Sequence, residues 1–179
     1  MDQKFPVTFR PEDRRFGHST HLKPERLGQG NDVLYNYAGP GITYIYNNGD
    51  GRDTVSNMSG EVVFHGLEPS DVVFKRMGSD LVASVTADAA RGIAAGRILF
   101  MDLLDANPSA PTRFVFDNGS ALTLQQVVAS LIAAETTNGS DTITGTGLDD
   151  VIAAGAGTDQ VSAGFGSDTY VWRHGDGHD

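Results

Sequence analysis

A nine-residue period near the C-terminal end constrains the fold of this sequence more than any other feature. Four aspartates recur at this interval, and four apolar residues keep the same interval two positions later: Asp141, Asp150, Asp159 and Asp168, with Ile143, Ile152, Val161 and Tyr170. The four rows read TTNGSDTIT, GTGLDDVIA, AGAGTDQVS and AGFGSDTYV. A carboxylate and an apolar residue that share one period over four rows indicate a repeat architecture.

Each row combines a tight turn with a very short strand. The first six residues are small and Gly-rich and end in Asp, so the backbone can bring carbonyl oxygens close to a carboxylate. The last three place one inward apolar side chain between two outward ones. Because two rows make one coil, we expect the first row to stack on the third and the second on the fourth. Carboxylates and carbonyls without His or Cys suit calcium.

The rows resemble the G-G-x-G-x-D-x-U-x nonapeptide of the repeats-in-toxin (RTX) family. In the second row Leu148 stands in place of the fourth-position glycine, and in the first row Thr136 and Thr137 replace the opening pair. The resemblance implies a parallel β-roll that binds calcium between stacked rows. The alternative, an acidic Gly/Ser-rich linker, is disfavoured because linkers do not hold an Ile/Val/Tyr period.

The resemblance also implies which residues surround the ions. The aspartate pairs are Asp141 with Asp159 and Asp150 with Asp168, and the turn residues are Gly139, Gly155, Gly157, Gly164 and Gly166. Asp149 precedes Asp150 directly, and neighbours in a strand point to opposite faces. We therefore expect Asp150 to face the ion and Asp149 to lie in solvent.

A worn copy of the pattern begins at Leu27. The segment LGQGNDVLY places Gly28, Gly30 and Asp32 as in the third row, so Asp32 is a further candidate calcium ligand. The segment AGPGITYIY that follows lacks the aspartate. We assign residues 27–46 to degenerate RTX repeats and residues 1–26, which are polar and basic, to a mobile arm.

The copy extends into a second shared motif. YIYNNGDGRDT at residues 44–54 matches YVWRHGDGHD at residues 170–179, at an offset of 126 residues. Asp50 with Asp53, and Asp176 with Asp179, could complete a further calcium site or form plain acidic turns. We expect the sequence to be part of a longer protein in which nonapeptide blocks alternate with other domains.

Residues 47–135 read as a β-rich domain that ends in a helix. The strand candidates are DTVSN, EVVFH, DVVFKR, DLVASV, RILFMD and TRFVFD, with hairpins at MGSD and at DNG. ADAARGIAAG fits a short helix or an open loop equally well. Thr123 and Gln126 form a capping box that begins an apolar-faced helix. This helix could cover the open end of the coil or pack on its own sheet.

The order of motifs over residues 44–133 resembles the haemolysin-type calcium-binding-related domain that alternates with RTX blocks in large secreted bacterial proteins. The resemblance implies a β-rich spacer without catalysis of its own. We therefore divide the chain into an arm (1–26), degenerate repeats (27–46), a spacer domain (47–135) and a β-roll that runs into the next module (136–179). The fold class is mainly β, with the β-roll after the spacer and its helix.

Charge and composition restrict the partners. The net charge is −10, which argues against nucleic acid as a partner. There is no cysteine, and neither a cleavable signal peptide nor a run of transmembrane length is present in these residues. Millimolar calcium is an extracellular condition, and the RTX resemblance implies type I export with a signal that we expect beyond Asp179.

Two functions remain open at this point. The first is a calcium-binding structural module of a secreted RTX toxin or adhesin, with neighbouring RTX modules as its partners. The second is a non-catalytic part of a secreted RTX enzyme such as a protease, lipase or polysaccharide-modifying protein. The sequence contains no HExxH motif, P-loop or nucleophile elbow, so we expect no catalysis from these residues.

Overall fold

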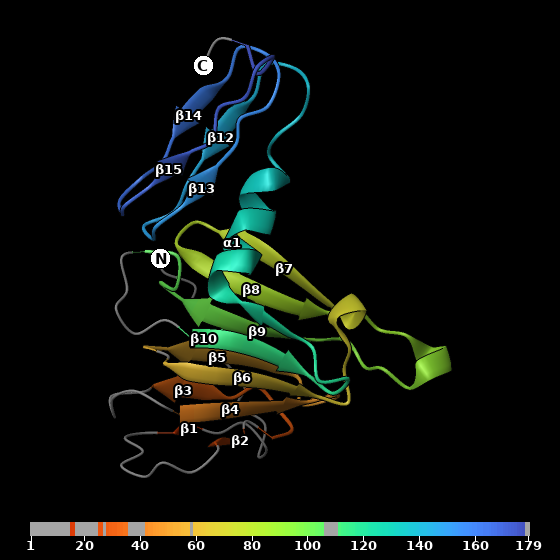
Figure 1. Ribbon diagram of the computed structural model, residues 1–179. Helices are drawn as coiled ribbons and strands as arrows, with labels where there is room; N and C mark the ends of the chain where they lie inside the picture. Colours follow the sequence, from red (N-terminus) through yellow and green to blue (C-terminus); the bar gives the residue numbers. More distant parts are fainter. Residues whose placement is uncertain are drawn as a thin grey trace, which may run out of the picture.

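The computed structural model describes residues 15–16, 25–26, 28–35, 42–57, 59–105 and 111–177. The fold is mainly β, with one α-helix among the described residues. Figure 1 shows a stack of strands below, a block of short strands above, and the helix α1 between them. The repeat rows therefore form a separate layer at one end of the molecule.

Two sheets make up the larger stack. The first has the order β1 (Arg15–Phe16), β3 (Val33–Tyr35), β5 (Arg52–Ser56), β9 (Gly96–Met101), β8 (Asp80–Val85) and β7 (Val72–Met77). The second has the order β11 (Ala121–Thr123), β10 (Pro111–Phe116), β6 (Gly60–His65), β4 (Ile42–Asn47) and β2 (Glu25–Arg26).

The chain crosses from one sheet to the other at each step from β1 to β6. Successive strands within each sheet are parallel, with Leu34 opposite Val55 in the first sheet and Tyr44 opposite Val62 in the second. This is a parallel coil, and it runs without a break across residues 46 and 47. The predicted degenerate repeats (27–46) and the start of the predicted spacer (47–135) thus contribute strands to the same two sheets.

The two sheets enclose an aromatic core. Along β4 the side chains alternate between buried and half-buried, which gives each strand one inward face. Phe64 of β6 stacks on Phe116 of β10, with ring centroids 5.3 Å apart. Phe100 of β9 meets Phe114 of β10 edge-on across the two sheets at 5.8 Å. Burial of these large rings stabilises the stack independently of any ion.

The six strands predicted in the middle of the chain are confirmed as β5 to β10, with small shifts at their ends. The MGSD hairpin is confirmed, because β7 and β8 pair antiparallel around it. The DNG hairpin is confirmed by the antiparallel pairing of β10 with β11. The Ala/Gly-rich loop contains a short 3₁₀ helix, η2 (Ala89–Arg91), and a second one, η1 (Pro69–Asp71), precedes β7.

Helix α1 (Leu124–Ala133) begins with the predicted capping box. Gln126 N donates to Thr123 Oγ1 at 3.1 Å, and Thr123 N donates to Gln126 Oε1 at 2.8 Å. The buried face of the helix, with Val127 and Val128, contacts β7, β10 and β11 of the stack and also strand β13 of the repeat block. The helix therefore packs on the strand stack and also contacts the repeat block, in agreement with both roles that the sequence suggested for it.

The mobile arm predicted for residues 1–26 lies mostly outside the described residues. The four residues of the arm that the structure describes pair as β1 and β2, in parallel with β3 and β4. No helix in the described part of the chain is long and apolar enough to cross a membrane.

Candidate calcium sites

The nonapeptide rows stack in the predicted register. Strand β12 (Thr142–Thr144) pairs in parallel with β14 (Gln160–Ser162), and β13 (Val151–Ile152) with β15 (Thr169–Tyr170). Ile143 aligns with Val161 and Ile152 with Tyr170, so the first row lies on the third and the second on the fourth. The stacking inferred from the nine-residue period is confirmed.

Only two of the four apolar residues at the predicted inward positions are fully buried. Ile143 and Ile152 are 0% and 1% exposed, whereas Val161 is half-buried and Tyr170 is 60% exposed. Tyr170 shares the face of Ile152 through its register, but it is exposed because no strand of the described residues pairs with β15 on its other side. The apolar core of the block is therefore small.

The aspartates form a ladder of hydrogen bonds between stacked rows. Asp141 N donates to Asp159 Oδ1 at 2.8 Å, across 18 residues of sequence. Asp150 N donates to Asp168 Oδ1 at 3.0 Å in the same way, also across 18 residues. Asp150 and Asp159 are buried, and Asp141 and Asp168 are half-buried. The structure thus brings together both pairs that the sequence analysis had placed around an ion.

In each pair, the aspartate whose N–H donates also closes its own turn through a threonine. Thr137 N donates to Asp141 Oδ2 and Thr146 N donates to Asp150 Oδ2, both at 2.6 Å. The hydroxyl of each threonine donates to the same carboxylate. The sequence analysis missed this role. The available signal was a threonine four residues before the aspartate in the first two rows, where the last two rows have glycine.

Glycines let the backbone of one row touch the carbonyls of another. Gly157 has a φ of 145°, and a Cβ there would clash with the carbonyl oxygen of Gly139. Gly166 has a φ of 117° and meets the carbonyl of Leu148 in the same way, so the second row keeps its turn without the usual glycine. The other predicted turn glycines with left-handed backbone are Gly155 and Gly164.

Asp149 and Asp150 point to opposite sides, as predicted. Asp150 is 1% exposed, whereas Asp149 is exposed and its Oδ1 accepts from Ser167 N at 2.7 Å. Asp149 therefore ties the second row to the fourth from the outside. This hydrogen bond adds to the solvated role that the sequence suggested for it.

The donor set of the ladder fits a hard divalent cation. Carboxylate oxygens from stacked rows and close-packed backbone carbonyls are ligands that calcium prefers, and His and Cys are absent from the rows. In the described residues no three His, Cys, Asp or Glu side chains converge on one point. A bound ion would therefore take two carboxylates and complete its shell with backbone carbonyls and water.

Asp32 lies in the strand stack, apart from the repeat block. It is buried, and its N–H donates to Asp53 Oδ1 at 2.9 Å across 21 residues. Asp50 and Asp176 occupy matching turns: Asp50 Oδ2 accepts from Asn47 N, and Asp176 Oδ2 accepts from Arg173 N. Asp179, the remaining partner proposed from the sequence, lies outside the described residues.

Burial raises the pKa of Asp53 to about 8, and the negative charges of Asp32 and Asp50 act in the same direction. The hydrogen bond from Asp32 N opposes this rise. Tyr46, which donates to Gly51 O at 2.8 Å, also has a raised pKa through burial and the same acidic neighbours Asp53 and Asp50. This turn therefore concentrates acidic side chains in a buried place.

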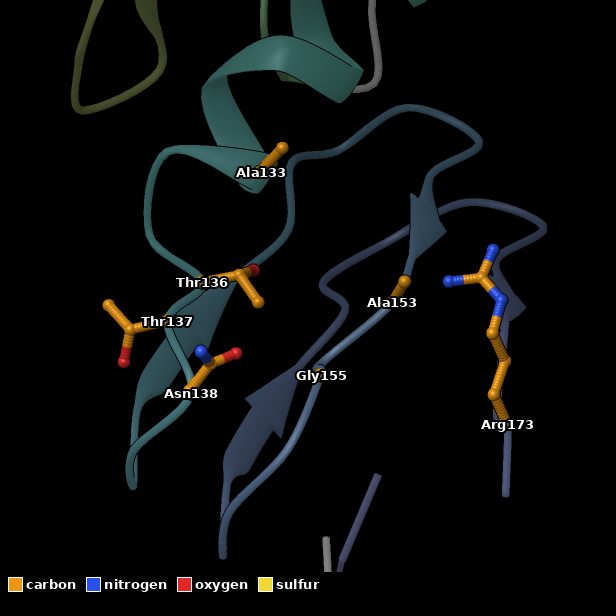
Figure 2. A pocket seen from close by; sticks show the side chains of 7 residues that line it. All are labelled: Ala133, Thr136, Thr137, Asn138, Ala153, Gly155 and Arg173. Atoms are coloured by element: carbon orange, nitrogen blue, oxygen red, sulfur yellow. The ribbon is translucent and has the colours of Figure 1, made fainter. Parts of the chain in front are cut away.

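The repeat block is attached to the stack by polar contacts beside α1. Arg76 Nη1 donates to Thr144 O at 2.8 Å, and Gly147 N donates to Leu104 O at 2.7 Å. A pocket of about 520 Å³ lies beside the C-terminal end of the helix. Figure 2 shows its lining residues, among them Thr137, Gly155 and Arg173. No carboxylate lines this cavity, so it is distinct from the aspartate ladder.

A family model described as RTX calcium-binding nonapeptide repeat (4 copies) matches residues 135–170. Neither the comparison with curated proteins nor that with solved structures found a match. The matched residues contain both ladder pairs and all four rows except Val171, and the repeat implies that the chain binds calcium. The chain thus carries RTX calcium-binding nonapeptide repeats at residues 135–170.

Proposed function

We propose that residues 136–179 comprise a parallel β-roll that folds on calcium, followed by the start of the next module. This part would serve as a structural module of a secreted bacterial RTX protein of the toxin or adhesin type. One observation carries this proposal: Asp159 Oδ1 and Asp168 Oδ1 each accept the N–H of the aspartate one level above. The ladder holds carboxylates at fixed spacing next to the turn carbonyls. The proposed ligands are Asp141, Asp150, Asp159 and Asp168 with the turns at Gly139, Gly155, Gly157, Gly164 and Gly166.

Calcium supplies the stability that the small apolar core lacks. Two fully buried isoleucines stabilise the block by about 1.5–3 kcal/mol each, which must offset the conformational entropy of some forty ordered residues. Stacked carboxylates repel one another when no cation lies between them. Calcium at a hundredfold excess over its dissociation constant adds about 2.7 kcal/mol for each site. Folding of the block therefore depends on the ion.

This dependence fits export. In cytosol with little free calcium the block stays unfolded, which suits passage through a type I exporter, and it folds where calcium is abundant. The role is structural, and neighbouring RTX modules of the same polypeptide are the partners. Residues 47–135 act as the spacer domain between repeat blocks.

Circular dichroism and thermal melting of the whole chain test this proposal. We expect the β signal and the melting temperature to rise when EGTA is replaced by millimolar calcium. Magnesium at the same concentration is the control, because it dehydrates reluctantly and fits carbonyl-rich sites poorly. An identical spectrum and melting temperature in EGTA and calcium would refute the proposal.

A further inference from the structure

Two arginines lie side by side on the outer face of the first sheet. Arg52 of β5 and Arg97 of β9 occupy opposite positions in the parallel pairing of these neighbouring strands. The residues that follow them, Asp53 and Ile98, are buried. Because successive side chains of a strand point to opposite faces, both arginines point away from the core, from strands about 4.8 Å apart.

Neither of these guanidinium groups makes an ion pair with the residues that the structure describes. Other arginines of the strand stack differ: Arg91 and Arg113 each pair with a carboxylate, and Arg76 donates to backbone carbonyl oxygens. The Nε of Arg97 is buried, and no described residue accepts its hydrogen. A buried guanidinium N–H without an acceptor is costly, so this position favours a bound acceptor.

The pair is also unfavourable when it stands alone. Like charges directly opposite each other on neighbouring strands destabilise a sheet. The acidic side chains nearest to Arg52 in sequence, Asp50 and Asp53, are buried and already accept backbone N–H groups. An anion from outside the chain would relieve the repulsion and supply the acceptor that Arg97 Nε lacks.

The donors on this face indicate the class of anion. Ser84 of β8 lies opposite Arg97 on the side away from Arg52, so its hydroxyl adds a neutral donor. Two guanidinium forks and a hydroxyl suit a tetrahedral oxyanion, because each fork can donate two parallel N–H groups to its oxygens. Sulfate, and phosphate near pH 8, carry two negative charges that match the two arginines. A single carboxylate would leave one positive charge uncompensated.

We infer that Arg52 and Arg97 bind one sulfate or phosphate group on the outer face of the first sheet, with Ser84 as a supporting donor. The anion would connect three neighbouring strands, β5, β9 and β8. The site uses neither calcium nor the aspartate ladder, so its failure would leave the proposed function unaffected.

The competing explanation is that both arginines are solvated and that their aliphatic stems cover the apolar side chains beside them. Leu99 is half-buried and Val82, which lies opposite it, is 4% exposed, although both point to the outer face. Arg97→Met keeps a stem and removes the charge, so it separates the two explanations. We expect this variant to lose the anion and to be at least as stable as the wild type in chloride, because the repulsion with Arg52 is gone.

NMR titration of the whole chain with sodium sulfate is the test. In millimolar calcium, with ionic strength held constant by chloride, we expect the Arg97 Nε–H resonance and the amides of β5 and β9 to shift and to saturate with one ion. Arg52→Gln should raise the dissociation constant at least about tenfold, because it removes one charge-assisted pair. Lys75→Gln makes the same charge change at an exposed position of the same face, and it should change the constant by less than about twofold.

Other anions decide which chemistry the site accepts. Phosphate is titrated in EGTA to avoid its precipitation with calcium, and the tighter of the two dianions identifies the ligand. Acetate should leave the Arg97 resonance in place, and equal shifts with acetate would contradict a site for two negative charges. Shifts that never saturate, or equal affinities in the wild type, Arg52→Gln and Arg97→Met, would indicate an adventitious ion only and would overturn the inference.

Discussion

The strand stack and the repeat block share one hydrogen-bond arrangement, but their apolar cores differ greatly in size. In both, an aspartate accepts the backbone N–H of the aspartate one level away, and a glycine touches the carbonyl across from it. The stack surrounds this arrangement with packed aromatic rings, whereas the block surrounds it with two buried isoleucines. This difference underlies our proposal that calcium is the main source of stability in the block, whereas the aromatic core stabilises the stack.

The largest expected effect is the selective loss of the block when calcium is removed. In EGTA, thermolysin should cut within residues 136–177 and leave the stack protected, because the aromatic core does not need the ion. Mass spectrometry of the fragments locates the cuts. Calcium should restore protection of the block. Equal resistance of the stack and the block to thermolysin in EGTA would contradict the claim that only the block needs calcium to fold.

Removal of a core ring should damage the stack whether or not calcium is present. Phe64 is fully buried and stacks on Phe116, so Phe64→Ala should cost about 3–5 kcal/mol of unfolding free energy. Phe165→Ala is the matched control, because Phe165 is 75% exposed and its loss should change stability by no more than about 0.5 kcal/mol. Urea unfolding in calcium measures both; similar values for the two variants would contradict the assigned core.

Within the block, the two kinds of aspartate should differ. Asp159→Ala should remove at least one ion's contribution, about 2.7 kcal/mol at a hundredfold calcium excess. Asp149→Ala should cost about 1 kcal/mol, since it loses only the hydrogen bond from Ser167 N. Calcium titrations followed by circular dichroism compare the two variants. Equal shifts of the calcium midpoint would refute the inward and outward assignment.

The smallest expected effect concerns an ion pair of the stack that has no part in calcium binding. Burial raises the pKa of Asp71, but hydrogen bonds from Arg91 and Glu68 N–H and the charge of Arg91 lower it below its ordinary value overall. A lowered folded-state pKa contributes stability above the unfolded pKa, and this is lost as the pH falls.

Arg91→Met should therefore reduce stability at neutral pH and shrink the difference between neutral and acid pH. Melting temperatures of the variant and the wild type along a pH series check this. A variant whose melting curve shifts equally at every pH would show that Arg91 acts through packing and not through the carboxylate of Asp71.

Much of the local structure could be predicted because its determinants are short in sequence. A period of nine residues fixes which rows stack, so the register of Ile143 on Val161 follows from spacing alone. The capping box at Thr123 and the turn residues of the two hairpins act within four residues. Burial of Asp150 beside exposed Asp149 agrees with the alternation expected for a strand, although both residues lie just before β13.

The continuous coil of the stack could not be predicted from residue spacing. Its steps vary in length, and the hairpin of β7 and β8 is inserted before β9 returns to pair with β5. Spacing therefore hides the equivalence of Asp53 with Asp159, although both accept an N–H from an aspartate one level away. The caps at Thr137 and Thr146 were not predicted because both residues stand where the repeat pattern has glycine, which has no hydroxyl.

Amide hydrogen exchange at Asp141 and Asp150 tests most directly whether calcium folds the repeat block. These two N–H groups donate to the carboxylates of Asp159 and Asp168, so they report the ladder itself. By NMR, we expect both to be strongly protected in millimolar calcium and to exchange at the rate of an unfolded chain in EGTA, while the amides of β6 stay protected in both. Equal protection of Asp141 and Asp150 with and without calcium would contradict the claim that the ion folds the block.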